Sequence, residues 1–131
     1  MGGLRTSLFV ILIGLGAVTR PVVLFAQTPP DLIAVMASCT GRLSALMEYQ
    51  WLVQDPASED TKIKRDEMAA LLQAVTPPGE DVRAMALRLD AKQSQAALLQ
   101  AARFGTDHAR SGWARQRAAH LLGTCAALLV S

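Results

Sequence analysis

The sequence has few of the residues from which chemical sites are built. Its 131 residues include two cysteines, two histidines and 5% aromatic residues. It contains no His-x-x-x-His, Glu-x-x-His, Cys-x-x-Cys or Cys-x-x-Cys-His motif, the spacings typical of metal and redox centres. Its serine, histidine and aspartate residues fall in expected helices or caps, and no expected strand would carry a nucleophile elbow. We therefore expect no cofactor, no metal and no enzymatic activity.

Charge of one sign is also scarce. The chain has 13 basic and 11 acidic residues, a formal net charge of +2. Arg5 and Arg20 supply that excess, so residues 27–131 are neutral overall. This balance argues against nucleic-acid binding, which is typical of strongly basic chains. The distribution is uneven, since residues 91–131 hold five basic groups and one acidic group.

The N-terminal segment has the features of a secretory signal peptide. Arg5 precedes an apolar run at residues 8–18, and Ala26 is a small residue suited to a cleavage site. The run is shorter than the roughly 20 apolar residues that cross a bilayer, and Arg20 interrupts any extension of it. We predict that residues 1–26 are a signal peptide and that the mature protein is secreted or periplasmic.

Two other interpretations of the N-terminal segment stay open. An uncleaved leader would anchor the domain in a membrane, as in an accessory subunit. Cys39 follows small residues, as a lipidated bacterial cysteine does, but Asp31 and two prolines separate it from the apolar run. We therefore favour a disulfide for Cys39.

Apolar residues recur at helical spacing through residues 27–131, which we expect to form a single helical domain. No segment alternates with the period of two typical of strands, so we predict an all-α fold. The expected helices cover residues 31–54, 59–75, 80–104 and 107–129. The residues expected to face the core are Leu32, Met36, Cys39, Leu43, Leu46, Val53, Ile63, Met68, Leu71, Leu72, Val75, Val82, Met85, Leu89, Ala96, Leu99, Ala114, Ala118, Leu121, Cys125 and Leu128.

The two cysteines predict how the helices are arranged. Exported proteins usually oxidise their thiols, so Cys39 and Cys125 are expected to form one disulfide. Cys39 lies near the start of the first expected helix and Cys125 near the end of the last. An even number of antiparallel helices brings these two positions to the same level. We predict an up-down four-helix bundle that is closed by this disulfide.

The same register places the aromatic residues together. If Cys39 and Cys125 are level on antiparallel helices, Trp51 and Trp113 are level too. Tyr49 and Phe104 fall near that same end, opposite the disulfide. We expect the four side chains to close the core there. The alternative is that they line a small ligand pocket or a docking patch.

A basic stretch surrounds Trp113 and comprises Arg110, Arg115 and Arg117. We expect a solvated face whose arginines pack along Trp113 or pair with acidic residues of the second helix, namely Asp60, Asp66 and Glu67. The alternative is an anionic partner, such as a lipid headgroup, a polysaccharide or an acidic protein surface.

These expectations favour an exported, non-catalytic binding or interaction module whose partner is another envelope protein or an anionic surface. A bundle that binds a ligand or a haem at its aromatic end is the competing hypothesis. The haem version would use Met47 and His120 as axial ligands, because the register places them within one turn of each other.

Overall fold

The computed structural model describes residues 31–130, which form four helices and no strand in that range. The helices are α1 (Leu32–Leu52), α2 (Ser58–Val75), α3 (Asp81–Phe104) and α4 (His108–Leu129). Each begins and ends within two residues of the range expected from the sequence. The predicted signal peptide lies outside the described residues. No helix between residues 31 and 130 has the length and hydropathy of a membrane span.

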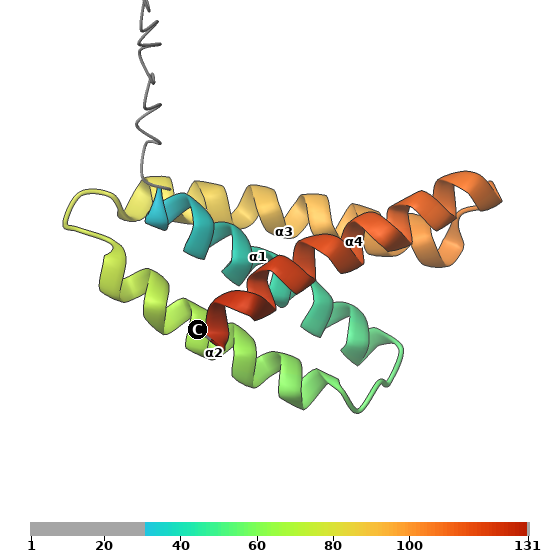
Figure 1. The fold of residues 1–131 in the computed structure, drawn as a ribbon, viewed down its shortest axis with the longest axis horizontal. Coiled ribbons are helices and arrows are strands. Elements are labelled where there is room, and N and C mark those ends of the chain that lie inside the picture. The colour runs from blue at the N-terminus through green and yellow to red at the C-terminus, as the bar shows by residue number, and fades with distance from the viewer. Residues whose placement is uncertain (1–30, 131) are drawn as a thin grey trace, which may run out of the picture.

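Successive helices run in alternating directions, but they do not form a regular square bundle (Figure 1). α1 packs mainly between α2 and α3, and α4 packs mainly along α3. α4 then crosses α1 at an angle, so the two helices touch only around their crossing point. The expectation that α1 and α4 lie side by side along their length is therefore wrong.

Small residues allow α1 and α3 to approach closely. Ala37, Gly41 and Ala45 are buried and lie four residues apart on one face of α1. A Cβ atom on Gly41 would overlap the backbone carbonyl oxygen of Arg88 and lie 2.9 Å from the backbone nitrogen of Lys92. The distance between packed helices depends on the side chains at their contact, so this stripe sets how near the two backbones lie.

The buried faces of α2 and α3 differ from those expected. Ile63 and Leu71 of α2 are exposed, while Met68 and Leu72 are buried as predicted. On α3 the exposed residues are Val82, Met85 and Leu89, and the buried ones are Ala84, Ala91 and Gln95. The close contact with α1 selects small residues on α3, so the face richest in large apolar side chains points away. Leu32 and Val53, at the ends of the α1 stripe, are exposed as well.

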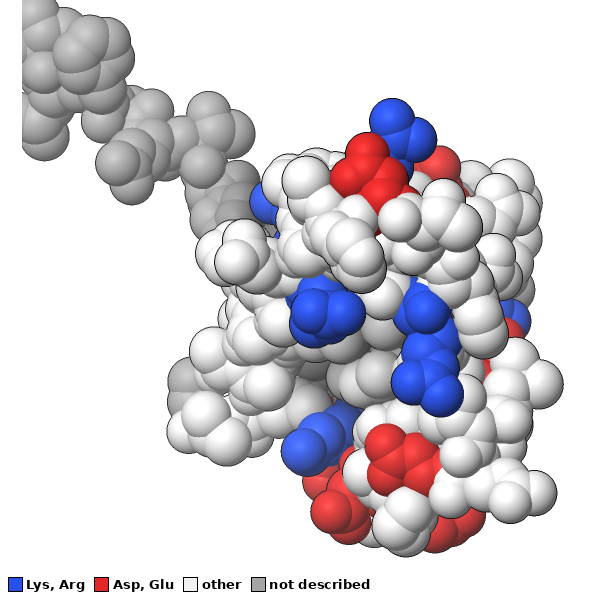
Figure 2. Space-filling model, turned by 90° about the vertical axis from the view of Figure 1, so that its right-hand side faces the viewer, with Lys and Arg blue, Asp and Glu red and all other residues white. Residues whose placement is uncertain are grey.

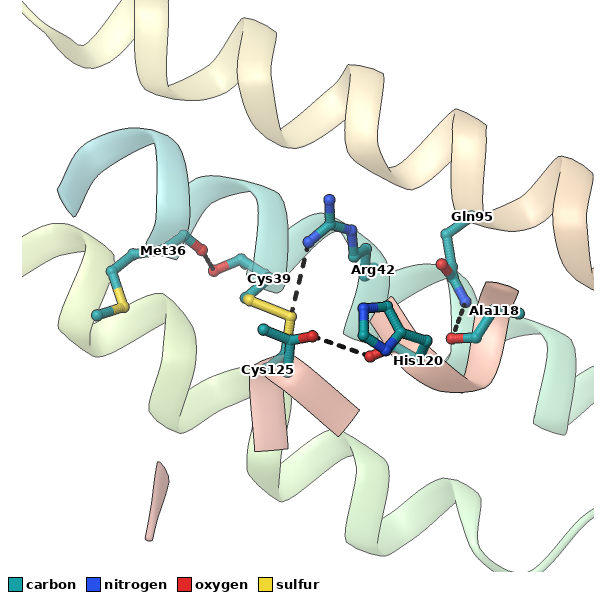
Figure 3. Close-up of a disulfide and its surroundings, with 9 residues drawn as sticks. Met36, Cys39, Arg42, Gln95, Ala118, His120 and Cys125 are labelled. Atoms are coloured by element: carbon teal, nitrogen blue, oxygen red, sulfur yellow. Dashed lines mark hydrogen bonds between the residues drawn. A yellow bond between two sulfur atoms is a disulfide. The ribbon is translucent and has the colours of Figure 1, made fainter. Parts of the chain in front are cut away.

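The predicted disulfide is present (Figure 3). Cys39 of α1 and Cys125 of α4 have Cα atoms 5.3 Å apart. Their sulfurs pack with Leu43 and Met68, and we call these four residues the disulfide cluster. α4 is also tied to α3, because the side-chain amide of Gln95 donates a hydrogen bond to the carbonyl oxygen of Ala118 at 3.4 Å.

Candidate functional site

The four aromatic residues do lie near the end of the molecule where α1 and α3 finish and α4 begins. We call this region the open end, because most of its aromatic side chains are uncovered. Trp51 is 49% exposed, Phe104 71% and Trp113 60%, whereas Tyr49 is half-buried. The expectation that these residues close the core is therefore wrong. The angled path of α4 is the physical cause, since α4 does not lie along the last turns of α1 (Figure 1).

The end of α1 is shaped by a tight turn. Gln54 adopts the left-handed conformation with φ of 57°, and the backbone N–H of Asp55 donates to the carbonyl oxygen of Gln50 at 2.8 Å. This hydrogen-bond pattern is typical of helix C-termini that stop abruptly. It leaves Leu52 in the last turn of α1, where its side chain is 84% exposed.

An apolar groove of about 420 Å³ runs between the C-terminal halves of α1 and α3. Leu52, Val53 and Phe104 lie at its outer part, and Ala45 and Ala96 lie along its length. The complete lining is Ala45, Glu48, Tyr49, Leu52, Val53, Ala96, Leu99, Gln100 and Phe104. Most of these side chains are hydrocarbon or aromatic, so the groove suits an apolar chain.

A second hollow of about 350 Å³ adjoins the groove and has a different character. Tyr49 and Leu99 line both, and Ala102, Arg103 and Arg115 complete the second. Arg115 donates a hydrogen bond to the carbonyl oxygen of Ala102 at 3.4 Å. We call this space the basic hollow. A molecule that fills both spaces would meet hydrocarbon at one end and guanidinium groups at the other.

The one acidic residue of the groove is already paired. Glu48 of α1 forms an ion pair with Lys92 of α3, with an oxygen to nitrogen distance of 2.6 Å. This ion pair joins α3 to α1. Among residues 31–130, Arg103 and Arg115 are the charged residues of the site that have no ion-pair partner.

The predicted pairing of the basic stretch with α2 is wrong. None of Arg110, Arg115 and Arg117 forms an ion pair with any residue from 31 to 130. Asp66 instead contacts Lys62 and Arg65 of its own helix, both at 3.1 Å. Burial, together with the like charge of Arg117, lowers the pKa of the Arg42 guanidinium.

The charged surface of the open end reflects this lack of pairing. Figure 2 looks onto this end of the molecule and shows basic side chains across the middle of the face, with acidic ones gathered mainly toward its upper and lower margins. The distribution leaves positive charge beside uncharged surface. An anionic group that reaches this face meets arginines that are not already neutralised.

The residues considered for haem have different surroundings. The sulfur of Met47 is buried and lies 3.8 Å from a guanidinium nitrogen of Arg65 on α2. His120 is exposed on α4 and is drawn beside the disulfide in Figure 3. Across residues 31–130 no three histidine, cysteine or carboxylate side chains gather in a way that could hold a metal ion.

The sequence named some residues of the site and missed others. For Tyr49, Phe104 and Arg115 a binding surface was the alternative considered, and they line the two spaces. Leu99 and Ala96 were assigned to the core, and Leu52 and Arg103 were not singled out. One feature of the sequence could have indicated this site. The C-terminal half of α1 is rich in apolar residues, and these continue beyond the buried part of the helix to Leu52.

Comparisons with known proteins do not assign a function. No protein-family model matches the chain, and no curated protein or solved structure matches it significantly. The geometry of the open end is therefore the basis on which a function is proposed.

Proposed function

We propose that the protein is an exported, non-catalytic binding module that holds its ligand or partner in the apolar groove of the open end. The observation that carries this proposal is the groove itself, with Leu52 and Phe104 uncovered at its outer part. Exposed apolar surface of this kind in a small domain typically marks a place where another molecule binds. The rest of the fold positions the groove and holds it open.

Export is supported by two independent features. The sequence predicts a signal peptide over residues 1–26, and Cys39 is joined to Cys125. Disulfides form and persist in oxidising compartments, so the bond is compatible with a secreted or periplasmic location. The two cysteines are 86 positions apart in the sequence, and a disulfide that closes so long a loop stabilises a domain that has a small core.

The groove offers recognition rather than reaction chemistry. Its charged groups are the ion pair of Glu48 with Lys92 and, in the adjoining hollow, the guanidinium groups of Arg103 and Arg115. Arginine stays protonated in proteins and binds anions, so it is suited to hold a charged group in place. We therefore assign the site a binding role and no bond-breaking step.

Two exposed residues provide a matched test of the proposed function. Leu52 lines the groove and is 84% exposed, whereas Val82 of α3 is 83% exposed and lies away from the groove. We expect Leu52→Asp to weaken binding of the dye 1-anilinonaphthalene-8-sulfonate, followed by its fluorescence, by about tenfold or more. Val82→Asp is expected to leave it unchanged.

We expect both variants to keep their helices, because neither position is part of the core, and circular dichroism tests this. Equal dye affinity for Leu52→Asp, Val82→Asp and the unmodified protein would show that the groove is not the binding site.

A further inference from the structure

We infer that the groove binds an amphiphile with a single long aliphatic chain and a carboxylate head, of the class of long-chain fatty acids. The chain lies in the apolar groove, and the carboxylate lies in the basic hollow between Arg103 and Arg115. This inference rests on the proposed function and specifies its ligand. It concerns single molecules taken up from solution rather than attachment to a bilayer.

The first argument is the order of the two spaces. The apolar groove and the basic hollow share Tyr49 and Leu99 in their linings, so the two spaces lie next to each other and differ in chemical character. A purely apolar ligand would leave the basic hollow empty, and a small anion would leave the groove empty. A linear amphiphile matches both, with Tyr49 and Leu99 beside its chain near the head.

The second argument is the availability of positive charge. Neither Arg103 nor Arg115 has an acidic partner in the part of the chain described here. Guanidinium groups bind carboxylates through paired hydrogen bonds, which are stronger than those between neutral groups. The two arginines come from α3 and α4 close to the connection between these helices, so a carboxylate between them would contact both helices.

The third argument is that nearby acidic groups are occupied. Lys92 neutralises Glu48 in the groove. Asp107 at the start of α4 accepts hydrogen bonds from the backbone N–H groups of Ala109 at 2.9 Å and Arg110 at 3.1 Å, and therefore caps the helix. An incoming anion is therefore repelled less by Glu48 than it would be by an unpaired carboxylate.

The volume of the site is appropriate for one aliphatic chain with its carboxylate head. The two spaces measure about 420 and 350 Å³. Pockets for small ligands typically measure about 300–1,000 Å³. The groove is open to water along one side, so a ligand can enter it without any rearrangement of the helices.

The test uses three ligands that share one chain and differ in the head. They are dodecanoate, dodecanol and dodecyltrimethylammonium, titrated below their micelle concentrations and followed by tryptophan fluorescence and calorimetry. We expect dodecanoate to bind most tightly and the cation most weakly. The double variant Arg103→Gln/Arg115→Gln should lose about tenfold or more in dodecanoate affinity, to the level of dodecanol, while its affinity for dodecanol stays unchanged.

The matched control is Arg110→Gln/Arg117→Gln, which removes the same charge from exposed positions that do not line the site. We expect it to change dodecanoate affinity by less than about twofold. Equal losses in the two double variants would overturn the inference, because they would show a general effect of charge. Equal affinities for dodecanoate and dodecanol would overturn it too.

The remaining outcomes separate this inference from the proposed function. If the dye binds the groove in a Leu52-dependent way but dodecanoate does not, the binding role stands and the ligand class is wrong. If vesicles of anionic phospholipid bind and monomeric dodecanoate does not, a membrane surface is the partner and the inference fails. If neither dye nor amphiphile responds to Leu52→Asp, the proposed function fails as well.

Discussion

The disulfide cluster and the open end are built from the same helices, yet their packing is opposite. Every residue of the disulfide cluster is at most 3% exposed, because α1, α2 and α4 meet there. At the open end Leu52 and Phe104 are among the most exposed side chains described. The difference follows from the angle of α4, which covers α1 at the crossing and leaves it uncovered beyond (Figure 1).

This contrast indicates that stability and binding are located in different parts of the molecule. One part holds the covalent link and the tightest packing, and the other leaves apolar surface and unpaired arginines accessible. Substitutions in the first region should therefore alter unfolding, and substitutions in the second should alter binding.

Removal of the disulfide should have the largest effect. The double variant Cys39→Ala/Cys125→Ala is expected to lower the free energy of unfolding by about 2–5 kcal/mol, because the unfolded chain gains conformational freedom. Urea unfolding followed by circular dichroism measures this loss. Reduction of the unmodified protein with dithiothreitol should reproduce it. A loss below about 1 kcal/mol would show that packing alone holds α4 in place.

Truncation of apolar side chains should separate the two regions most directly. Leu43→Ala removes a buried side chain from the disulfide cluster and should lower the free energy of unfolding by about 2–5 kcal/mol. Phe104→Ala removes a larger but exposed side chain and should change it by less than about 0.5 kcal/mol. Urea unfolding of both variants gives the comparison. Similar losses would mean that the open end contributes to the core.

Gly41→Ala tests the close contact between α1 and α3. The added methyl group meets the backbone of α3, so we expect a loss of about 1–3 kcal/mol in the free energy of unfolding. Gly123→Ala is the matched control, because a Cβ there has no atom within 4 Å and Gly123 lies within α4. It should stabilise the protein by up to about 1 kcal/mol. Stabilisation by both changes would contradict the described contact.

The smallest expected effect is a dependence on pH at the start of α1. The hydrogen bond from Arg83, followed by that from the backbone of Ala34, lowers the pKa of Asp31 below 3.8. The folded state thus favours the carboxylate, and its contribution to stability is present above pH 3.8 and lost as the pH falls below that value. Asp31→Asn should therefore lower the melting temperature slightly at pH 7, with the difference narrowing in acid.

The control for this change is Asp90→Asn on α3, an exposed residue that has no ion pair among residues 31–130. It should not alter the melting temperature in a pH-dependent way. A difference at Asp31 that persists unchanged in acid would show that its charge is not involved.

The sequence predicted the helices and the disulfide because the signals for both are local or few in number. Helix periodicity, caps and proline or glycine stops fix where each helix begins and ends. The chain has two cysteines, so Cys39–Cys125 is the one disulfide that can form within a molecule. The face of α4 that contains Ala114, Ala118 and Cys125 was also predicted correctly, since it packs against neighbours along its length.

The buried faces of the other helices could not be found in the same way. Periodicity selects the stripe with the largest apolar side chains, such as Val82, Met85 and Leu89 of α3. The structure buries the stripe with the smallest, because Gly41 brings the two backbones together and leaves space only for Ala84 and Ala91. Helix propensity and spacing do not report how closely two helices approach.

The candidate site was predicted only in part, because the sequence indicates the level of a residue along a helix but not the angle at which two helices cross. Equal height along antiparallel helices correctly placed Tyr49 and Phe104 near the same end, and both line the groove. It did not indicate that α4 crosses at an angle, so the aromatic residues were expected inside the core. The crossing angle depends on contacts between helices far apart in sequence, and it decides whether this end is packed or open.

The disulfide has a topological consequence for the chain as a whole. Cys39 and Cys125 close a covalent ring that contains all three connections between helices, at residues 53–57, 76–80 and 105–107. A protease that nicks one of these connections in the oxidised protein would leave both fragments attached, and reduction would be needed to release them.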